Sequence, residues 1–250
     1  MIRVCNVTKR FGNQLVLDNV SLDIPDGKTT AIVGPSGVGK SVLLKLIVGM
    51  IKPDFGQIWI GDKEITAVNR EVDLNKIRAD LGVLFQNAAL FDSLTVYENV
   101  AFPLRQRNKR NSRIEIHKKV VSMLEELSLE AFAYCLPGEL SMGMRKRVGM
   151  ARALVTLPKV ILFDEPNTGL DPWDGQEVYN LIKKIRTDFG FTGIVISHEI
   201  PEVFQVADQV IMLLKGQIAE EGTPEAMQCS TNPAVQQFLT GSIDGPIKIQ

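Results

Sequence analysis

Hydrophobic and polar residues alternate at the start of the chain and predict extended structure there. Ile2, Val4 and Val7 are apolar and rich in β-branched side chains, and the alternation resumes over residues 15–24 after a turn at Gly12-Asn13. A period of two places successive side chains on opposite faces of a strand. We therefore predict two or three strands with an antiparallel start over residues 2–24.

Further along, short apolar runs alternate with helical segments. Strands are predicted at 29–33, 57–60, 82–85, 160–163, 193–196 and 210–214, and helices at 42–50, 175–186 and 199–207. The runs 57–60 and 82–85, separated by a charged segment, resemble edges of a core sheet. Because strands that alternate with helices usually pair in parallel, the pattern predicts an α/β fold with a parallel sheet covered on both faces.

Between residues 95 and 157 the spacing of apolar residues becomes helical. One helix face, at i, i+4, i+7, i+8 and i+11, would carry Ile116, Val120, Met123, Leu124 and Leu127. This spacing predicts a helical insertion into the α/β domain. Two further short helices are predicted after Gly222, ending near Leu239.

Composition narrows the class of protein but not its activity. With 250 residues, 45% apolar and 23% charged, the chain is typical of a globular domain, and a net charge of -1 gives no global reason to expect nucleic acid as a partner. The three cysteines have no metal-ligand spacing, which favours a reducing compartment. The longest apolar run, 43–51, is far shorter than the roughly 20 residues of a membrane helix, and no secretory signal begins the chain. We expect a cytoplasmic protein.

The strongest chemical signal is a glycine-rich loop between a predicted strand and a predicted helix. It matches G-x-x-x-x-G-K-[ST] with Gly34, Pro35, Ser36, Gly37, Val38, Gly39, Lys40 and Ser41. Such a loop wraps backbone N–H groups around an anion, Lys40 reaches the terminal phosphates and Ser41 ligates magnesium. The alternative, a chance glycine-rich turn, does not explain the flanking elements. We predict a site for a nucleoside triphosphate and Mg²⁺ that extends to Val42, and the loop alone does not distinguish among the P-loop families.

Two adjacent carboxylates, Asp164 and Glu165, end the apolar strand 160–163. Neighbouring residues on a strand point to opposite faces, so we predict separate tasks. Asp164 would hold the magnesium shell and Glu165 would orient and activate water. Alone, the pair would equally fit a solvated strand end, and the phosphate loop is what favours the catalytic interpretation.

A third motif, Leu140-Ser141-Met142-Gly143-Met144, precedes a helix predicted from Arg145 to about Val155. Ser141 and Gly143 would present a hydroxyl and backbone N–H groups at a helix start, which is a second anion site. A serine before a helix is by itself usually an N-cap. The position of this motif before the Asp-Glu strand supports the functional interpretation.

Together these motifs resemble those of the ABC ATPase family, over nearly the whole chain from Ile2 to Pro224. The resemblance implies an ATP hydrolase with a P-loop core and parallel sheet, an antiparallel β subdomain and a helical subdomain. It also implies roles for four more residues: an aromatic that stacks on adenine, a Q-loop glutamine near magnesium, a D-loop aspartate and a switch histidine at the γ-phosphate. These are Phe11, Gln86, Asp171 and His198.

The family pattern also implies how the molecule is organised and assembled. An ABC ATPase domain would span 1–224, with its helical subdomain at about 87–157, followed by an extension at 225–250. Residues 140–144 resemble the signature motif of the family. Two copies would stack head to tail, with each ATP between the phosphate loop of one copy and the signature motif of the other. Met142 departs from the family, which has glycine there. We expect retained but slowed activity if the backbone at Met142 has a negative φ.

The amino-acid sequences of segments 90–96 and 144–148 resemble those of the ATPases of Mla-type, Mce-associated phospholipid transport systems. This implies a transmembrane permease, a second copy of the ATPase and an MCE-type substrate-binding protein as partners, at the inner face of the cell membrane, with no nucleic acid. ATPases of polar amino acid or methionine importers are the first alternative. The basic run 105–113 fits lipid head groups or a solvated loop.

Soluble ABC ATPases that act on DNA or ribosomes are a second alternative. They usually join two ATPase units or insert a coiled coil, whereas this sequence has one phosphate loop and no sustained heptads. A P-loop kinase or GTPase would have no use for the motif at 140–144 or for His198.

Overall fold

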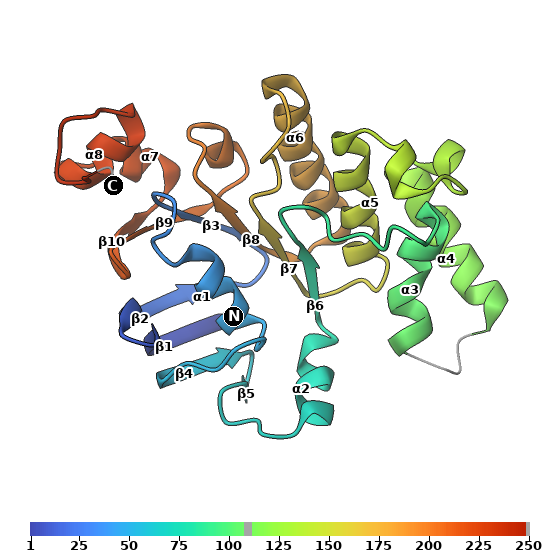
Figure 1. Ribbon diagram of the computed structural model, residues 1–250, viewed down its shortest axis with the longest axis horizontal. Coiled ribbons are helices and arrows are strands. Elements are labelled where there is room, and N and C mark those ends of the chain that lie inside the picture. The colour runs from blue at the N-terminus through green and yellow to red at the C-terminus, as the bar shows by residue number, and fades with distance from the viewer. Residues whose placement is uncertain (108–111, 249–250) are drawn as a thin grey trace. The chain divides into compact units, whose positions relative to one another are not determined.

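The computed structural model describes residues 1–107 and 112–248, and its chain divides into two compact units. Unit 1 comprises residues 1–78 and 191–250, and unit 2 comprises residues 79–190 (Figure 1). Lys109 and Arg110 of the basic run lie outside the described residues. The domain boundary at residue 224 stays a prediction.

Unit 1 contains an antiparallel sheet in the order β2-β1-β4-β5. Its strands are β1 (Ile2–Phe11), β2 (Gln14–Ile24), β4 (Phe55–Ile60) and β5 (Lys63–Glu64). The predicted antiparallel start is confirmed, with Phe11 opposite Gln14 across the turn. The prediction of β4 as an edge of the core sheet is wrong, because β4 pairs with both β1 and β5. A short apolar run does not indicate which sheet it joins.

The second group of strands in unit 1 has the order β10-β9-β3-β8. It consists of β3 (Thr29–Val33), β8 (Thr192–Ser197), β9 (Gln209–Leu214) and β10 (Gln217–Gly222). β3 runs parallel to β8 and to β9, and every residue of β3 and β8 is buried, so the predicted parallel strands are confirmed. β10 was not predicted, because its polar sequence gains a strand conformation only by pairing with β9.

The helices of unit 1 agree with the sequence in two places and differ in two. They are α1 (Lys40–Ile47), α2 (Glu71–Arg78), the 3₁₀ helix η3 (Glu202–Gln205), α7 (Pro224–Gln228) and α8 (Pro233–Thr240). α1 begins two residues earlier than predicted, and the two short helices after Gly222 are confirmed. The charged segment was not expected to hold α2. The helix predicted at 199–207 is wrong: Pro201 lacks an amide hydrogen and restricts the residue before it, so only η3 forms.

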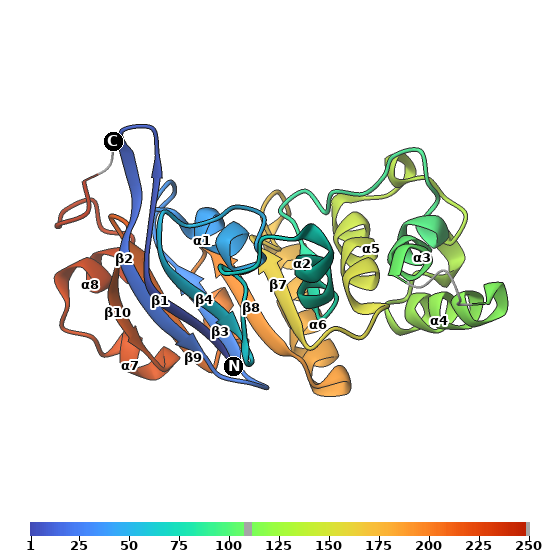
Figure 2. The ribbon, with the colours of Figure 1, turned by 90° about the horizontal axis from the view of Figure 1, so that it is seen from below.

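Unit 2 combines two parallel strands with the predicted helices. Its elements are β6 (Leu81–Leu84), α3 (Val96–Arg107), α4 (Arg113–Glu126), the 3₁₀ helices η1 (Glu130–Phe132) and η2 (Pro137–Glu139), α5 (Met142–Leu154), β7 (Val160–Asp164) and α6 (Pro172–Phe189). α3 packs against α4 and α5 (Figure 2). All five apolar residues of the predicted helix face are buried, which confirms the period.

The cysteines Cys5, Cys135 and Cys229 are free. Within residues 1–107 and 112–248, no helix is both long and apolar enough to span a bilayer.

Candidate functional site

The glycine-rich loop connects β3 to α1 with a backbone that requires glycine. Gly34, Gly37 and Gly39 have φ of 146°, 77° and 106°, in the region that disfavours other residues. A Cβ at Gly34 would lie 2.2 Å from the carbonyl oxygen of Leu213, whereas a Cβ at Gly37 would meet nothing within 4 Å. The loop is therefore closed against β9 on one side and open on the other.

Lys40 holds the loop from inside. Its side chain is buried, and Nζ donates hydrogen bonds to the carbonyl oxygens of Gly34 (2.7 Å) and Pro35 (2.9 Å). Lys40 is also the first residue of α1, and Ser41 follows it, half-buried. An ammonium group at a helix amino terminus beside a glycine loop provides positive charge and N–H donors suited to phosphate.

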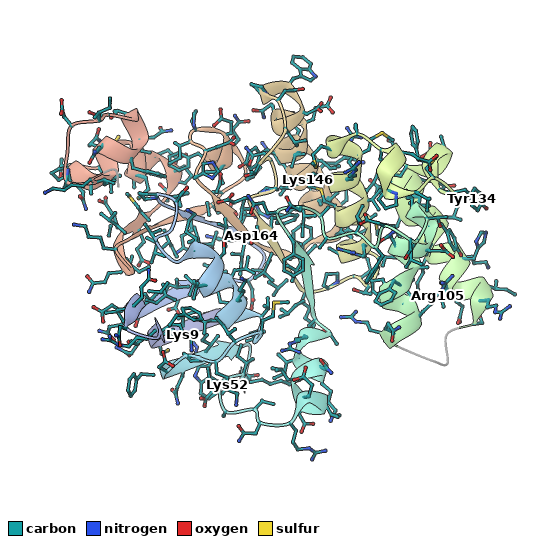
Figure 3. All side chains as sticks on the ribbon, in the orientation of Figure 1. Lys9, Lys52, Arg105, Tyr134, Lys146 and Asp164 are labelled. Atoms are coloured by element: carbon teal, nitrogen blue, oxygen red, sulfur yellow. The ribbon has the colours of Figure 1, made fainter. Side chains whose placement is uncertain are left out.

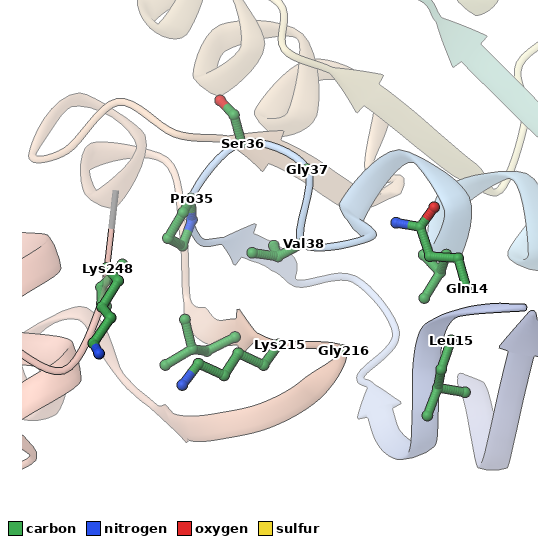
Figure 4. Close-up of a pocket in the computed structure, with 12 residues that line it drawn as sticks. Gln14, Leu15, Pro35, Ser36, Gly37, Val38, Lys215, Gly216 and Lys248 are labelled. Carbon is green, nitrogen blue, oxygen red and sulfur yellow. The ribbon is translucent and has the colours of Figure 1, made fainter. Parts of the chain in front are cut away.

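A cavity of about 730 Å³ in unit 1 adjoins this loop (Figure 4). Its wall includes Pro35, Ser36, Gly37 and Val38, together with residues 14–16, 214–216 and 247–248. Phe11 is not part of the lining: it ends β1, is half-exposed, and has Lys9 Nζ 5.4 Å from its ring centroid.

Sequence reasoning missed two cations in this lining, Lys215 and Lys248. Lys215-Gly216 between two strands is a turn signal. Only the parallel pairing of β3 with β9 brings that turn to the phosphate loop, and no local pattern in the sequence contains this information.

His198 follows β8 and is exposed. Val33 is paired with Ser197, so the phosphate loop and His198 leave their parallel strands at the same edge. Unit 1 thus brings the predicted switch histidine to the edge that carries the loop.

In unit 2, the two predicted catalytic side chains contact each other. The amide Nε2 of Gln86 donates to Oε2 of Glu165 at 3.1 Å, and Thr168 Oγ1 donates to the same oxygen at 3.1 Å. β7 ends at Asp164, and Glu165 has a φ of 47°. The expectation that both carboxylates lie on the strand is therefore wrong. The chain turns at Glu165, so strand alternation is not what separates the two residues.

Lys146 on α5 lies beneath this pair, and no motif singled it out. Its side chain is fully buried, and Nζ donates to the carbonyl oxygens of Gln86 and, at 3.4 Å, Glu165. Burial lowers the pKa of Lys146 to about 8, against the opposite effect of the nearby carboxylates of Glu165 and Asp164. Lys146 and Asp164 are labelled in Figure 3.

The signature motif, residues 140–144, lies at the start of α5, and its Ser141 is the N-cap of the helix. Ser141 Oγ accepts a hydrogen bond from the Met144 amide at 3.3 Å, and the helix starts at Met142, three residues earlier than predicted. Met142 is therefore helical with a negative φ, the condition set for retained activity, and its side chain is 40% exposed. Gly143 and Ser141 line a second cavity, of about 200 Å³, with residues of α6.

Asp171 is the N-cap of α6. Its Oδ1 accepts a hydrogen bond from the Asp174 amide at 2.9 Å, and Pro172 occupies the first helical position. A Cβ at Gly143 would lie 3.4 Å from Oδ2 of Asp174. The first turns of α5 and α6 thus meet at this second cavity.

A family model described as ABC transporter matches residues 17–168. The chain belongs to this family. It is 41% identical over 247 residues to the intermembrane phospholipid transport system ATP-binding protein MlaF of Escherichia coli (strain K12), covering 99% of this chain and 91% of MlaF. It is 40% identical over 246 residues to the probable ribonucleotide transport ATP-binding protein mkl of Mycobacterium leprae (strain TN), covering 98% of this chain and 70% of mkl.

A solved structure agrees with this membership. The ATP-binding cassette MJ0796, in a dimeric post-hydrolysis state bound to ADP and Pi, matches with a TM-score of 0.81 and 35% identity, covering 90% of this chain and 99% of that one. The chain is an ABC-type ATPase with the ABC ATPase fold: a P-loop core with parallel strands, an antiparallel β subdomain and a helical subdomain.

The residues predicted to bind nucleotide and metal lie in both units of the chain. The phosphate loop and Ser41 belong to unit 1, and Gln86 and Asp164 belong to unit 2. The part of the chain that the structure describes holds no cluster of three His, Cys, Asp or Glu side chains able to bind a metal ion. The predicted donors, the Asp164 carboxylate with the Ser41 hydroxyl and the Gln86 amide oxygen, fit Mg²⁺, which proteins bind through one or two carboxylates together with water and phosphate oxygens.

Proposed function

We propose that the chain is the ATP-binding and ATP-hydrolysing subunit of an ABC transporter that powers phospholipid transport through a separate membrane permease. The nearly full-length similarity to the phospholipid transport protein MlaF carries the proposal about cargo. The subunit would work as a peripheral protein on the cytoplasmic face of the inner membrane. An MCE-type substrate-binding protein would complete the system, and nucleic acid would have no part in it.

In this proposal the phosphate loop, 34–42, holds the phosphates of ATP. The positive φ angles of the loop and the buried ammonium of Lys40 support this assignment. Phe11 would stack on adenine, and Ser41 with Asp164 and Gln86 would hold Mg²⁺. The metal ion supplies charge neutralisation at the transferring phosphoryl group.

Glu165 would act as the general base for the attacking water. Its carboxylate would accept the water proton while the Gln86 amide, at 3.1 Å, and the Thr168 hydroxyl hold Oε2 in place. His198 would contact the γ-phosphate. The hydrogen bond from Gln86 to Glu165 supports placing both residues in one catalytic group.

Two copies would form the working motor, arranged head to tail. Ser141, Gly143 and Asp171 would face the ATP held by the other copy, and the dimeric state of the cassette MJ0796 supports this arrangement. ATP binds the closed dimer more tightly than the open one and so closes it, and hydrolysis adds charge repulsion that reopens it. We further propose that the ATPase domain spans 1–224, with its helical subdomain at about 87–157 and a carboxyl-terminal extension from 225.

Glu165→Gln tests the catalytic part of the proposal. Removal of a general base costs a factor of roughly 10² to 10⁴ in rate and leaves binding largely intact. We expect the full chain, purified with its membrane partner, to lose ATP turnover and to accumulate as an ATP-bound dimer in sedimentation. Glu125→Gln, on the exposed side of α4, makes the same chemical change and should keep wild-type turnover. A normal rate in Glu165→Gln contradicts the assignment.

The identity of the retained partner tests the cargo. Mass spectrometry of the trapped complex should find a permease and an MCE-type protein, and vesicles of phospholipid should stimulate ATP turnover. Stimulation by ribonucleotides, the cargo in the name of mkl, or by methionine or polar amino acids would contradict lipid transport. Retention of nucleic acid or ribosomes instead of a membrane protein would contradict transport altogether.

A further inference from the structure

Lys146 is a buried cation that none of the roles above uses. Among the described residues, the buried lysines are Lys40, in the phosphate loop, and Lys146, whose relative exposure is 0%. An ammonium group loses its hydration when it is buried, so it persists only where acceptors and opposite charges replace the water. Its surroundings therefore indicate its task.

Lys146 is surrounded by the two loops that carry the proposed catalytic residues Gln86 and Glu165. Nζ donates to the main-chain carbonyls of Gln86 and Glu165, residues 60 and 19 positions away in the sequence. Both segments follow the carboxyl ends of paired parallel strands, since Leu84 of β6 is opposite Phe163 of β7. The carboxylates of Glu165 and Asp164 supply the opposite charge. One ammonium thus joins the main chains of two loops that are far apart in the sequence.

The same two residues are joined a second time through their side chains. The Gln86 amide donates to the Glu165 carboxylate at 3.1 Å. The contacts form a closed ring from the ammonium to the main chain of Gln86, through the amide and carboxylate to Glu165, and back through the Glu165 carbonyl. In such a ring, a shift of either main chain changes the amide–carboxylate geometry.

Glu165 needs this support because of its backbone. Its φ of 47° lies in the left-handed region, which residues other than glycine adopt at an energetic cost. Such a conformation persists only when surrounding contacts hold it. The bond from Lys146 to the Glu165 carbonyl is one of those contacts.

We propose that Lys146 is a positioning residue for hydrolysis. Its buried ammonium holds the main chains of Gln86 and Glu165 in a fixed position relative to each other, so that the Glu165 carboxylate stays directed at the attacking water. This inference rests on the proposed role of Glu165. Lys146 acts through Glu165 and Gln86, so its loss affects the chemical step and not nucleotide affinity.

The experiment compares three lysine variants in the full chain purified with its membrane partner. Lys146→Met keeps the length of the side chain and removes its charge and donors, whereas Lys146→Arg keeps both. Lys159→Met makes the same change at an exposed site of unit 2. We expect Lys146→Met to lower kcat by about 10- to 100-fold with KM for ATP within about twofold, Lys146→Arg to restore part of kcat, and Lys159→Met to match wild type.

A double variant separates this inference from the proposed function. If both residues act through one carboxylate, adding Lys146→Met to Glu165→Gln should lower kcat no further. Additive losses, or a wild-type kcat in Lys146→Met beside an inactive Glu165→Gln, overturn the role of Lys146 and leave that of Glu165 standing. Full activity of Glu165→Gln overturns the proposed function first. Should Lys146→Met fail to fold, a folded Lys146→Gln with wild-type kcat overturns the inference, and one with reduced kcat and unchanged KM supports it.

Discussion

At the scale of single residues, the Asp54 carboxylate binds both the main chain and a side chain of β1. Its carboxylate accepts hydrogen bonds from the amide of Arg10 at 2.6 Å and from Nζ of Lys9 at 3.2 Å. The same Nζ lies 5.4 Å from the ring centroid of Phe11, the proposed adenine-stacking residue. Asp54 therefore restrains the Lys9 ammonium beside that ring, and protonation of Asp54 would release the ammonium.

The pKa of Asp54 should lie below its ordinary value of 3.8, first because of the backbone hydrogen bond and then because of Lys9. A depressed folded pKa means that the contribution of Asp54 to stability is present above pH 3.8 and is lost as the pH falls through the folded value. An NMR titration of the Asp54 carboxyl carbon measures this directly. Lys9→Met should raise the pKa only in part, since the Arg10 amide remains, and a wild-type pKa at or above 3.8 would contradict the account.

Local motifs made some site residues predictable, and long-range contacts hid others. The loop 34–41 was predictable because its spacing is contiguous and its chemistry is specific. Lys146 was not, since its acceptor on Gln86 is 60 positions away and a lysine in the second turn of a helix is ordinarily solvated. Lys215 was hidden for the same reason, because only strand pairing brings it to the phosphate loop.

At the scale of elements, burial decides what a sequence reveals. The interior strands β3, β8 and β9 were predicted nearly to the residue, because a strand buried on both faces is a continuous apolar run. β10 and α2 were missed because their sequences are polar. β10 forms by pairing with β9, and α2 buries only Leu74 and Ile77. The roles of the site residues and the boundary at residue 224 are still predictions.

Helix α5 contains a glycine whose replacement tests how tightly the helix packs on β6. Alanine in a helix interior usually gains about 0.5–1 kcal/mol over glycine. At Gly149, however, a Cβ would lie 2.6 Å from Cδ1 of the buried Leu84 and 3.2 Å from Cβ of Ala88. Overpacking of this kind costs about 1–3 kcal/mol. We expect Gly149→Ala to lower the free energy of unfolding in urea by about 1–2 kcal/mol.

Gly175 in α6 is the matched control. A Cβ there would meet Cβ of Asn167 at 3.5 Å, an ordinary contact, so Gly175→Ala should leave stability unchanged or raise it by up to about 1 kcal/mol. Both variants should keep the wild-type urea m-value. A more stable Gly149→Ala protein would mean that α5 can move away from β6 at no cost.

At the scale of the whole molecule, the residues predicted for the site are distributed over the two compact units of the sequence. Unit 1 carries the phosphate loop and His198, and unit 2 carries Gln86, Glu165 and the signature motif at 140–144. In the proposed assignment, the loop that holds the phosphates and the Gln86–Glu165 pair that serves hydrolysis therefore come from different parts of the sequence. Variants of the phosphate loop should change affinity, and variants of the Gln86–Glu165 pair should change turnover.

Binding of ATP should raise the stability of the full chain through the phosphate loop. A ligand at 100 times its Kd stabilises the native state by about 2.7 kcal/mol, which for a chain of this size raises Tm by about 5–10 °C. Lys40→Ala should abolish this shift. It should also lower Tm without nucleotide, because Lys40 Nζ bonds the carbonyls of Gly34 and Pro35. The deciding quantity is therefore the difference in Tm with and without Mg-ATP, measured by calorimetry for each variant. Lys45→Ala, exposed on the same helix, should keep the full difference, and its retention in Lys40→Ala would exclude this loop as the nucleotide site.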